Sequence, residues 1–202
     1  MLKVRTFPVG AIATNCYLVF DDAAKSLCVI DPGGDGEFIA GAAREFAPEK
    51  TQILLTHAHV DHISGIGELL KLLPGTPVWV HPDDLDMYRS PENALEPWLP
   101  AARGLPEPAV GTPEFPGMKI LHLPGHTPGG VGYYFAAEKM LFSGDTLFAG
   151  SVGRTDLPGG DWNTLKNAIE QTLFALPDDV RVFCGHGPAT SVGREKNSNP
   201  YL

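Results

Sequence analysis

The chain has little positive charge and no long apolar run. Its 15 Lys and Arg residues are outnumbered by 24 Asp and Glu residues, which leaves a net charge of −9. A nucleic-acid partner requires a basic surface, so this balance argues against nucleic acid as the main partner. No apolar stretch approaches the length that spans a bilayer, and residues 1–6 lack the apolar core of a secretory signal. We therefore expect no membrane partner.

Cysteine is also scarce. Cys16, Cys28 and Cys184 show no paired spacing. An odd number of cysteines without a signal segment predicts reduced thiols and a cytoplasmic protein. Packing as small buried hydrophobic residues is the preferred interpretation of all three, although Cys184 is close enough to a candidate ligand to line a site.

Length and patterning predict one α/β domain that spans residues 1–202. Short apolar runs predict strands at residues 2–7, 16–20, 27–30, 53–55, 77–80, 119–123, 131–135, 139–143 and 181–184. Helical spacing of apolar residues predicts helices at 38–46, at 66–73 with Ser64 as N-cap, and at 162–176 with Asp161 as N-cap. Residues 90–116 contain seven prolines, which suits either an irregular surface excursion or a flap over the functional site.

Five of the seven histidines lie in turns that follow short apolar runs. Residues 56–62 read Thr-His-Ala-His-Val-Asp-His, directly after the apolar residues 53–55. Three further turns carry His126, Asp145 and His186, and each of these residues is preceded by glycine, which permits close backbone approach. His81 and His122 lie outside this arrangement and have no candidate partner, so ordinary positions are predicted for them.

The residues in these turns can supply two sets of metal ligands. His57 and His59 point to one face of extended backbone, and with His126 they form the three-imidazole set of many catalytic zinc sites. The second set is Asp61, His62 and His186. Asp145 has two oxygens with which to bridge two ions, which lie ~3.5–4 Å apart in two-metal hydrolytic sites. We expect two divalent metal ions, with zinc preferred and iron or manganese also accepted.

Such a centre suits hydrolysis. Two divalent ions against two carboxylates and one hydroxide leave a formal charge of about +1, which favours an oxyanion in the transition state. Bound metal lowers the pKa of water toward ~7 and so supplies a metal-activated hydroxide. Asp61 is the candidate catalytic residue because it can hold that hydroxide in line for attack. The alternative is a protein without enzymatic activity, in which the chain's own residues occupy every ligand position of the metal.

The motif at residues 56–62 resembles the signature of the metallo-β-lactamase superfamily, and His126, Asp145 and His186 follow in the order that this family uses. Residues 124–129, 144–148 and 185–187 are most similar to glyoxalase II and its short relatives. The resemblance implies a four-layer αβ/βα sandwich with a dinuclear site at one edge. It also implies hydrolysis of a small-molecule acyl-glutathione thioester such as S-lactoylglutathione.

The resemblance places Arg154 as a basic substrate contact, while an Arg154–Asp156 pair that stabilises the loop is the alternative. Only 16 residues follow His186, so the chain lacks the C-terminal helical segment with which longer glyoxalase II enzymes hold glutathione. Pro188 stands where the family often has a tyrosine that contacts glutathione. The resemblance therefore implies thioester hydrolysis more strongly than glutathione recognition, and it specifies no oligomeric state.

Two other activities suit the same residues. Ester or lactone hydrolysis follows the same logic as thioester hydrolysis. Persulfide dioxygenases also resemble the chain, including residues 154–156, and they use one iron held by the equivalents of His57, His126 and Asp145. Metal content and oxygen uptake separate this oxidation from hydrolysis.

Overall fold

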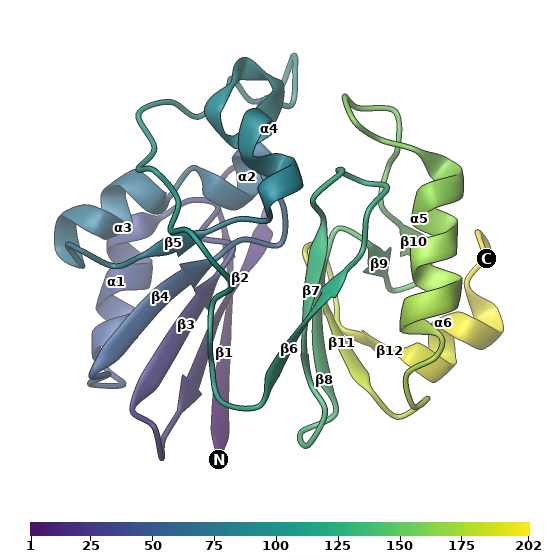
Figure 1. Cartoon of the computed structure of the whole chain (residues 1–202), viewed down its shortest axis with the longest axis horizontal. Helices are drawn as coiled ribbons and strands as arrows, with labels where there is room; N and C mark the ends of the chain where they lie inside the picture. The colour runs from purple at the N-terminus through teal and green to yellow at the C-terminus, as the bar shows by residue number, and fades with distance from the viewer. The chain divides into compact units, whose positions relative to one another are not determined.

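The computed structural model describes all residues 1–202 and divides them into two compact units (Figure 1). Unit 1 comprises residues Met1–Val80 and Leu85–Pro116, and unit 2 comprises His81–Asp84 and Gly117–Leu202. Each unit contains one five-stranded mixed sheet. None of the helices combines the length and the apolar character needed to cross a membrane.

Unit 1 is built on a sheet of order β1-β2-β3-β4-β5. The strands are β1 Leu2–Val9, β2 Thr14–Asp21, β3 Ser26–Ile30, β4 Lys50–Leu54 and β5 Val78–Trp79. The first three strands pair antiparallel, and β3, β4 and β5 pair parallel. Its helices are α1 Gly36–Arg44, α2 Val60–Ile63, α3 Ile66–Leu72 and α4 Leu85–Arg89.

The apolar faces predicted for the helices at residues 38–46 and 66–73, which correspond to α1 and α3, pack against this sheet. Ile39 of α1 and Ile66 and Leu69 of α3 join the same core cluster as Leu18 and Ile53 of the strands, and α1 and α3 lie together along one side of the sheet in Figure 1. Full burial of such a side chain contributes roughly 1.5–3 kcal/mol, so this shared core holds the helices in place.

The helix starts in this region differ from the prediction in one respect. Ser64 does not cap α3, whose N-cap is Gly65. Ser64 instead ends the short helix α2, where its hydroxyl donates to the carbonyl of Val60 one turn earlier. The prediction missed α2 because a four-residue helix is too short to show a helical period.

Residues 90–116 are mostly irregular, with a 3-10 turn at Pro91–Asn93. Hydrogen bonds fasten the segment to the rest of unit 1: the Trp79 indole donates to the Gly111 carbonyl at 2.7 Å, and the Tyr88 hydroxyl to the Pro106 carbonyl at 3.0 Å. The backbone N–H of Ala109 donates to the Val78 carbonyl at 2.7 Å. The segment is therefore anchored along its length.

Unit 2 is built on a sheet of order β12-β11-β8-β7-β6. The strands are β6 Met118–His122, β7 Val131–Phe135, β8 Met140–Gly144, β11 Arg181–Cys184 and β12 Thr190–Ser191. Strands β8 and β11 pair parallel, and the other neighbours pair antiparallel. A separate two-stranded sheet joins β9 Leu147–Phe148 to β10 Ser151–Val152.

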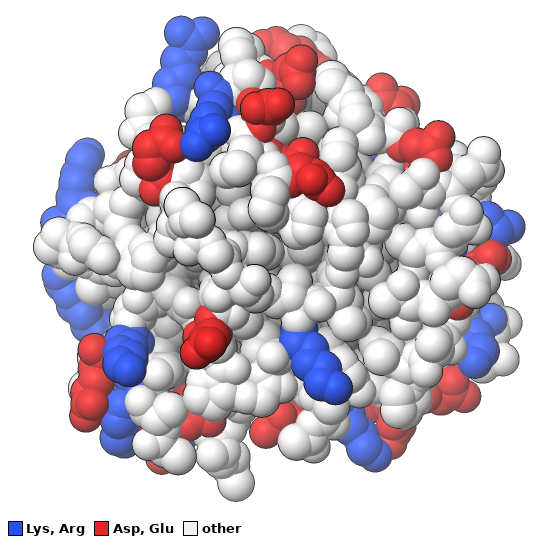
Figure 2. Space-filling model, viewed as in Figure 1, with Lys and Arg blue, Asp and Glu red and all other residues white.

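Two helices of unit 2 lie on one side of its five-stranded sheet (Figure 1). They are α5 Trp162–Ala168, which continues as the π-helical turn Ile169–Leu173, and α6 Val192–Ser198. Asp161 caps α5 as predicted, because its side chain accepts from the N–H of Thr164 at 2.7 Å. Figure 2 shows acidic and basic side chains interspersed on one face, without a continuous basic patch.

Candidate metal centre

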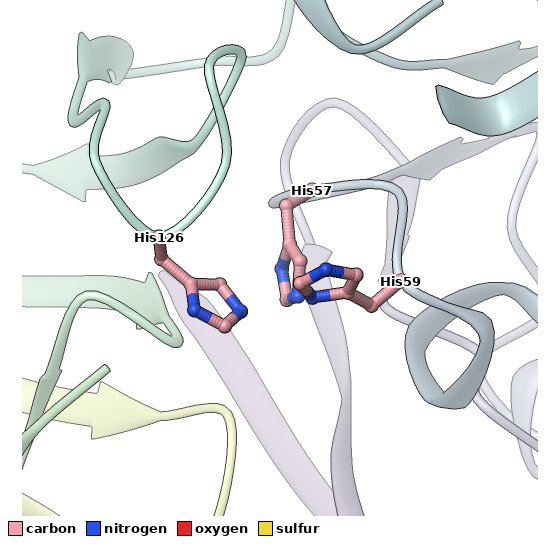
Figure 3. Close-up of side chains that lie close together, drawn as sticks. All are labelled: His57, His59 and His126. Atoms are coloured by element: carbon pink, nitrogen blue, oxygen red, sulfur yellow. The ribbon is translucent and has the colours of Figure 1, made fainter. Parts of the chain in front are cut away.

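The four ligand candidates of the motif at residues 56–62 lie in unit 1, directly beyond the end of β4. His57, His59, Asp61 and His62 are all buried. The ring centroids of His57 and His59 are 4.8 Å apart, and those of His57 and His62 are 4.1 Å apart. Figure 3 shows the rings of His57 and His59 turned toward each other from the loop that leads into α2. The structure thus brings together the donors that the motif predicted to be neighbours.

A buried carboxylate, Asp31, sets the orientation of two of these rings. One carboxylate oxygen of Asp31 accepts from the backbone N–H of Thr56 at 2.7 Å. The other accepts from the Thr56 hydroxyl at 2.7 Å and from Nδ1 of His62 at 2.9 Å. The Thr56 oxygen in turn lies 3.0 Å from Nδ1 of His57. Asp31 therefore reaches His62 directly and His57 through a hydroxyl.

These hydrogen bonds fix which ring nitrogens carry protons. A carboxylate only accepts, so Nδ1 of His62 carries the proton that Asp31 receives. The hydroxyl hydrogen of Thr56 is given to Asp31, so Nδ1 of His57 must donate to the Thr56 oxygen. Both neutral rings then hold their lone pairs on Nε2, which is the arrangement that outer carboxylates impose on metal-binding histidines.

Asp31 is the residue of this site that sequence reasoning missed. In the sequence, Asp31 precedes Pro32 and two glycines, which is typical of an ordinary turn residue. The signal that could have identified it is its position directly after the buried strand β3, the same position that the ligand candidates occupy after their own strands. Its backbone is left-handed, with φ of 52°, a conformation that Asp and Asn tolerate better than most residues.

Asp61 is also held in place within unit 1. Its Oδ2 accepts from the hydroxyl of Thr14, at the start of β2, at 2.9 Å. The same oxygen lies 3.3 Å from Nε2 of His62, where the neutral ring presents its lone pair. Two electron-rich atoms at this separation repel each other unless a cation or a proton lies between them. The pair therefore fits a bound metal ion.

Unit 2 brings its three ligand candidates together through strand pairing. Strands β8 and β11 are parallel neighbours, and the N–H of Gly185 donates to the carbonyl of Gly144 at 2.8 Å. Asp145 follows β8 and His186 follows β11, so their side chains emerge at the same edge of the sheet. Oδ2 of Asp145 lies 3.6 Å from Nε2 of His186.

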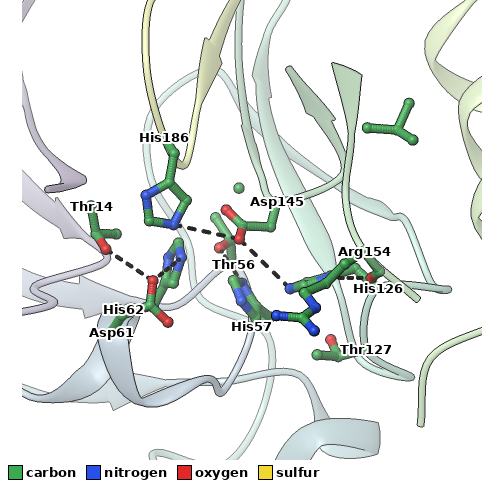
Figure 4. A network of polar contacts seen from close by, with 12 residues as sticks. Thr14, Thr56, His57, Asp61, His62, His126, Thr127, Asp145, Arg154 and His186 are labelled. Atoms are coloured by element: carbon green, nitrogen blue, oxygen red, sulfur yellow. Dashed lines mark hydrogen bonds and ion pairs between the residues drawn. The ribbon is translucent and has the colours of Figure 1, made fainter. Parts of the chain in front are cut away.

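The same oxygen of Asp145 lies 3.7 Å from Nε2 of His126 (Figure 4). Nδ1 of His126 donates to the backbone carbonyl of Arg154 at 2.7 Å, so the neutral ring holds its lone pair on Nε2, facing the carboxylate. One carboxylate oxygen thus stands between two imidazole nitrogens. This is the arrangement expected of a carboxylate that bridges two cations.

The turn that carries His126 is held by tight packing and by a second buried carboxylate. Gly125 has φ of 124°, and a Cβ atom there would lie 2.2 Å from the backbone nitrogen of Leu165. Asp84, which is fully buried, accepts from the Thr127 hydroxyl at 2.9 Å and from the Gly129 N–H at 2.6 Å. Asp84 is therefore a positioning residue for this turn, and sequence reasoning did not find it.

Gly153 packs directly against the unit 2 donors. A Cβ atom at this position would lie 1.9 Å from the backbone oxygen of Asp145 and 3.3 Å from Cβ of His126. Only glycine therefore allows the chain before Arg154 to approach this closely. The approach places the Arg154 carbonyl where Nδ1 of His126 can donate to it.

The Arg154 side chain forms the ion pair that was the alternative interpretation of this residue. Its Nε donates to one carboxylate oxygen of Asp156 at 2.7 Å, and one terminal nitrogen donates to the other oxygen, also at 2.7 Å. These hydrogen bonds lower the pKa of Asp156 to about 2. Arg154 also lines a surface cavity of about 410 Å³ together with Trp162 and Tyr201.

Three further residues are placed by the structure. Cys184 is fully buried in the core of unit 2, and burial raises the pKa of its thiol to about 12, so packing is the correct interpretation.

His81 and His122 do not lack partners as the sequence analysis expected. Their ring centroids lie 4.5 Å apart with an angle of 12° between planes, and the sequence does not reveal this pairing because the two residues are 41 positions apart.

Known proteins resemble the chain over most or all of its length. A sequence model of the metallo-beta-lactamase superfamily matches residues 9–186, which include every ligand candidate. The chain is 38% identical to the hydroxyacylglutathione hydrolase GloC of Haemophilus influenzae, over 100% of this chain and 98% of that protein. These matches confirm the family resemblance that the motifs predicted.

Solved structures show the same fold. The crystal structure of TTHA1623 in a di-iron-bound form matches with a TM-score of 0.86 and 37% identity, over 98% of this chain and 100% of that chain. The BLEG-1 B3 metallo-beta-lactamase matches with a TM-score of 0.87 and 34% identity, over 99% of both chains. The predicted fold class, an α/β metallo-β-lactamase-like sandwich, is confirmed.

Proposed function

Because the chain belongs to the metallo-beta-lactamase superfamily, we propose that it is a metal-dependent hydrolase that cleaves a thioester of the S-lactoylglutathione type. The observation that carries this proposal is the proton arrangement of the donors: hydrogen bonds hold His57, His62 and His126 with their lone pairs on Nε2. The thioester is supported by the full-length similarity to a hydroxyacylglutathione hydrolase.

Two divalent cations are proposed as cofactors. By ligand type, His57, His59 and His126 would hold one cation, and Asp61, His62 and His186 would hold the other. Asp145 would serve as a ligand of both cations, since its Oδ2 lies 3.7 Å from Nε2 of His126 and 3.6 Å from Nε2 of His186. The similarity to a di-iron protein supports two ions and makes iron a serious alternative to zinc, since imidazole and carboxylate ligands accept both metals.

The chain's own residues orient the reaction. When bound, the cations polarise the substrate carbonyl and lower the pKa of water toward ~7. Thr14 holds the Asp61 carboxylate through its Oδ2, so Asp61 can position the attacking water against the carbonyl. A thiol has a pKa of ~8.5 and departs as thiolate, so the reaction requires no general acid from the chain.

Arg154 is proposed as a substrate contact that remains paired with Asp156. Its guanidinium is exposed on one side and lines the cavity with Trp162 and Tyr201. A carboxylate of the thiol carrier can approach the exposed part of the guanidinium, and the aromatic side chains can pack against the carrier's apolar part.

The test uses wild-type protein whose metal content has been counted, with S-lactoylglutathione, a lactone, a β-lactam and glutathione persulfide as substrates. We expect about two ions per chain, thioester turnover above that of the other substrates, and no oxygen uptake. Asp61→Asn should lower kcat by about 100-fold or more, since positioned acid–base groups contribute 10²–10⁴-fold. Asp86→Asn, at an exposed position, is the matched control.

One result would overturn the proposed hydrolysis, and another would overturn the role of Asp61. Oxygen consumption with the persulfide and no thioester cleavage would identify a dioxygenase. Wild-type turnover in Asp61→Asn, with the fold retained by circular dichroism, would remove Asp61 from the reaction.

A further inference from the structure

A second group of potential metal ligands lies within unit 2 and shares no residue with the centre described above. His81 precedes the 3-10 turn Pro82–Asp84, Asp83 lies in that turn, and His122 ends β6. One ligand atom from each of the three lies within 4.8 Å of the others. Two imidazoles and one carboxylate are a ligand set that borderline transition metals accept.

The distances in this group are close to those of a coordinated ion. Nδ1 of His81 lies 3.7 Å from Oδ2 of Asp83, and Nε2 of His122 lies 3.9 Å from the same oxygen. In a tetrahedral site with ligand bonds of about 2.1 Å, neighbouring ligand atoms are about 3.4 Å apart. Shifts of a few tenths of an ångström would therefore bring each imidazole nitrogen to a coordinating separation from the Asp83 oxygen.

These separations are too long for direct hydrogen bonds between the side chains. The Asp83 carboxylate therefore faces both imidazoles from beyond hydrogen-bond distance, while Nδ1 of His81 accepts from the backbone N–H of Asp83 at 3.3 Å. Burial and the neighbouring His122 lower the pKa of His81, so its ring is present in the neutral form that ligates metals.

Three local contacts must change when an ion binds. Nδ1 of His81 accepts from the backbone N–H of Asp83 at 3.3 Å, so coordination through this nitrogen gives up that hydrogen bond. Nε2 of His122 donates to the Pro128 carbonyl at 2.9 Å, so coordination through this atom gives up that hydrogen bond. The parallel rings must also tilt so that both lone pairs converge, and the His122 side chain, 44% exposed, has the freedom to do so. All three changes make this site weaker than a buried, fully oriented one.

We propose that His81, Asp83 and His122 form an accessory site for one transition-metal ion of the Zn²⁺ class, with water completing the coordination. The site is independent of the proposed thioester activity, because none of its residues belongs to the catalytic centre. Its exposure predicts exchange with metal in solution rather than permanent occupancy.

The test is equilibrium dialysis of Zn²⁺ against protein that is already saturated at its principal centre. Wild type should bind one further equivalent of zinc. Asp83→Asn and His81→Ala should each weaken this binding at least about tenfold, since even loss of an outer-shell partner costs 10–100-fold in metal affinity. Asp86→Asn, also exposed and three residues further along, should bind zinc as wild type does.

A second measurement does not depend on any variant folding. In the wild-type protein, the imidazole NMR signals of His81 and His122 should both shift as the extra zinc binds. The proposal fails if wild type binds no further zinc, if Asp83→Asn binds it as tightly as wild type, or if the two imidazole signals remain unchanged at saturation.

Discussion

Replacement of Asp31 by asparagine tests whether the proton arrangement of the donors depends on one carboxylate. Asparagine keeps the size of the side chain and tolerates the left-handed backbone at φ of 52°, so the fold itself is not strained. The amide oxygen can still accept from the Thr56 N–H, but an NH₂ group now faces the Thr56 hydroxyl and Nδ1 of His62. Because an NH₂ group donates, both neighbours must become acceptors.

This reversal reaches the atoms that would bind metal. If His62 accepts at Nδ1, its proton moves to Nε2, where it faces Asp61. If Thr56 accepts from the amide, its hydroxyl turns toward His57 and moves that ring's proton to Nε2 as well. Metal must then displace two protons, and we expect affinity to fall by about 10- to 100-fold, the cost of losing outer-shell partners.

The assay is competition with a chelator of known affinity, on metal-free protein to which zinc or iron is added back. The metal-free variant should also lose stability of about 1.5–3 kcal/mol, because a buried charge-assisted hydrogen bond is removed. Asp35→Asn is the matched control: Asp35 is also left-handed, with φ of 50°, but its carboxylate accepts one exposed hydrogen bond, from the N–H of Gly10 at 2.9 Å. Metal affinity of Asp31→Asn within about twofold of wild type would refute the reasoning.

Three further predictions concern the loop beside the unit 2 donors. Gly153→Ala should reduce metal content, because its Cβ would lie 1.9 Å from the backbone oxygen of Asp145 and must displace the turn that carries the Asp145 carboxylate; full metal occupancy by elemental analysis would contradict this. Arg154→Ala should mainly raise KM for glutathione thioesters and leave kcat within about threefold, whereas unchanged kinetics would leave Arg154 a structural residue. The Arg154–Asp156 pair should hold at every pH above about 4, because the pKa of Asp156 is lowered to about 2 and the pairing is lost only as pH falls through that value. An NMR titration of the Asp156 carboxyl measures this pKa. A midpoint near the ordinary value of 3.8 would show that the pair does not form in solution.

The sequence predicted elements where one local rule decides the structure. The strands at residues 131–135 and 181–184 were predicted with the bounds of β7 and β11, because each is an apolar run closed by a turn. The cap of α5 by Asp161 follows from a contact only three residues away. The ligand turns were recognised for the same reason, since each donor directly follows a strand.

Residues whose role depends on distant partners were missed. Asp31 contacts Thr56 across 25 positions and His62 across 31, and Asp84 contacts Thr127 across 43. Each of these carboxylates looks like an ordinary turn residue in its own segment. Local patterns contain no information about which distant segment a turn will meet, so the supporting hydrogen bonds could not be assigned.

Strand pairing brings the ligand residues, which the sequence predicted, together with the supporting carboxylates, which it did not. The parallel pairing of β3 with β4 aligns Ile30 with Leu54, and this register delivers Asp31 to the backbone of Thr56, just before the ligand histidines. The parallel pairing of β8 with β11 delivers Asp145 and His186 to one sheet edge in the same way. A one-residue slip in either pair would turn the next side chain to the opposite face and separate carboxylate from imidazole. The register of two parallel strand pairs therefore determines the donor geometry, and the buried apolar residues of those strands maintain it.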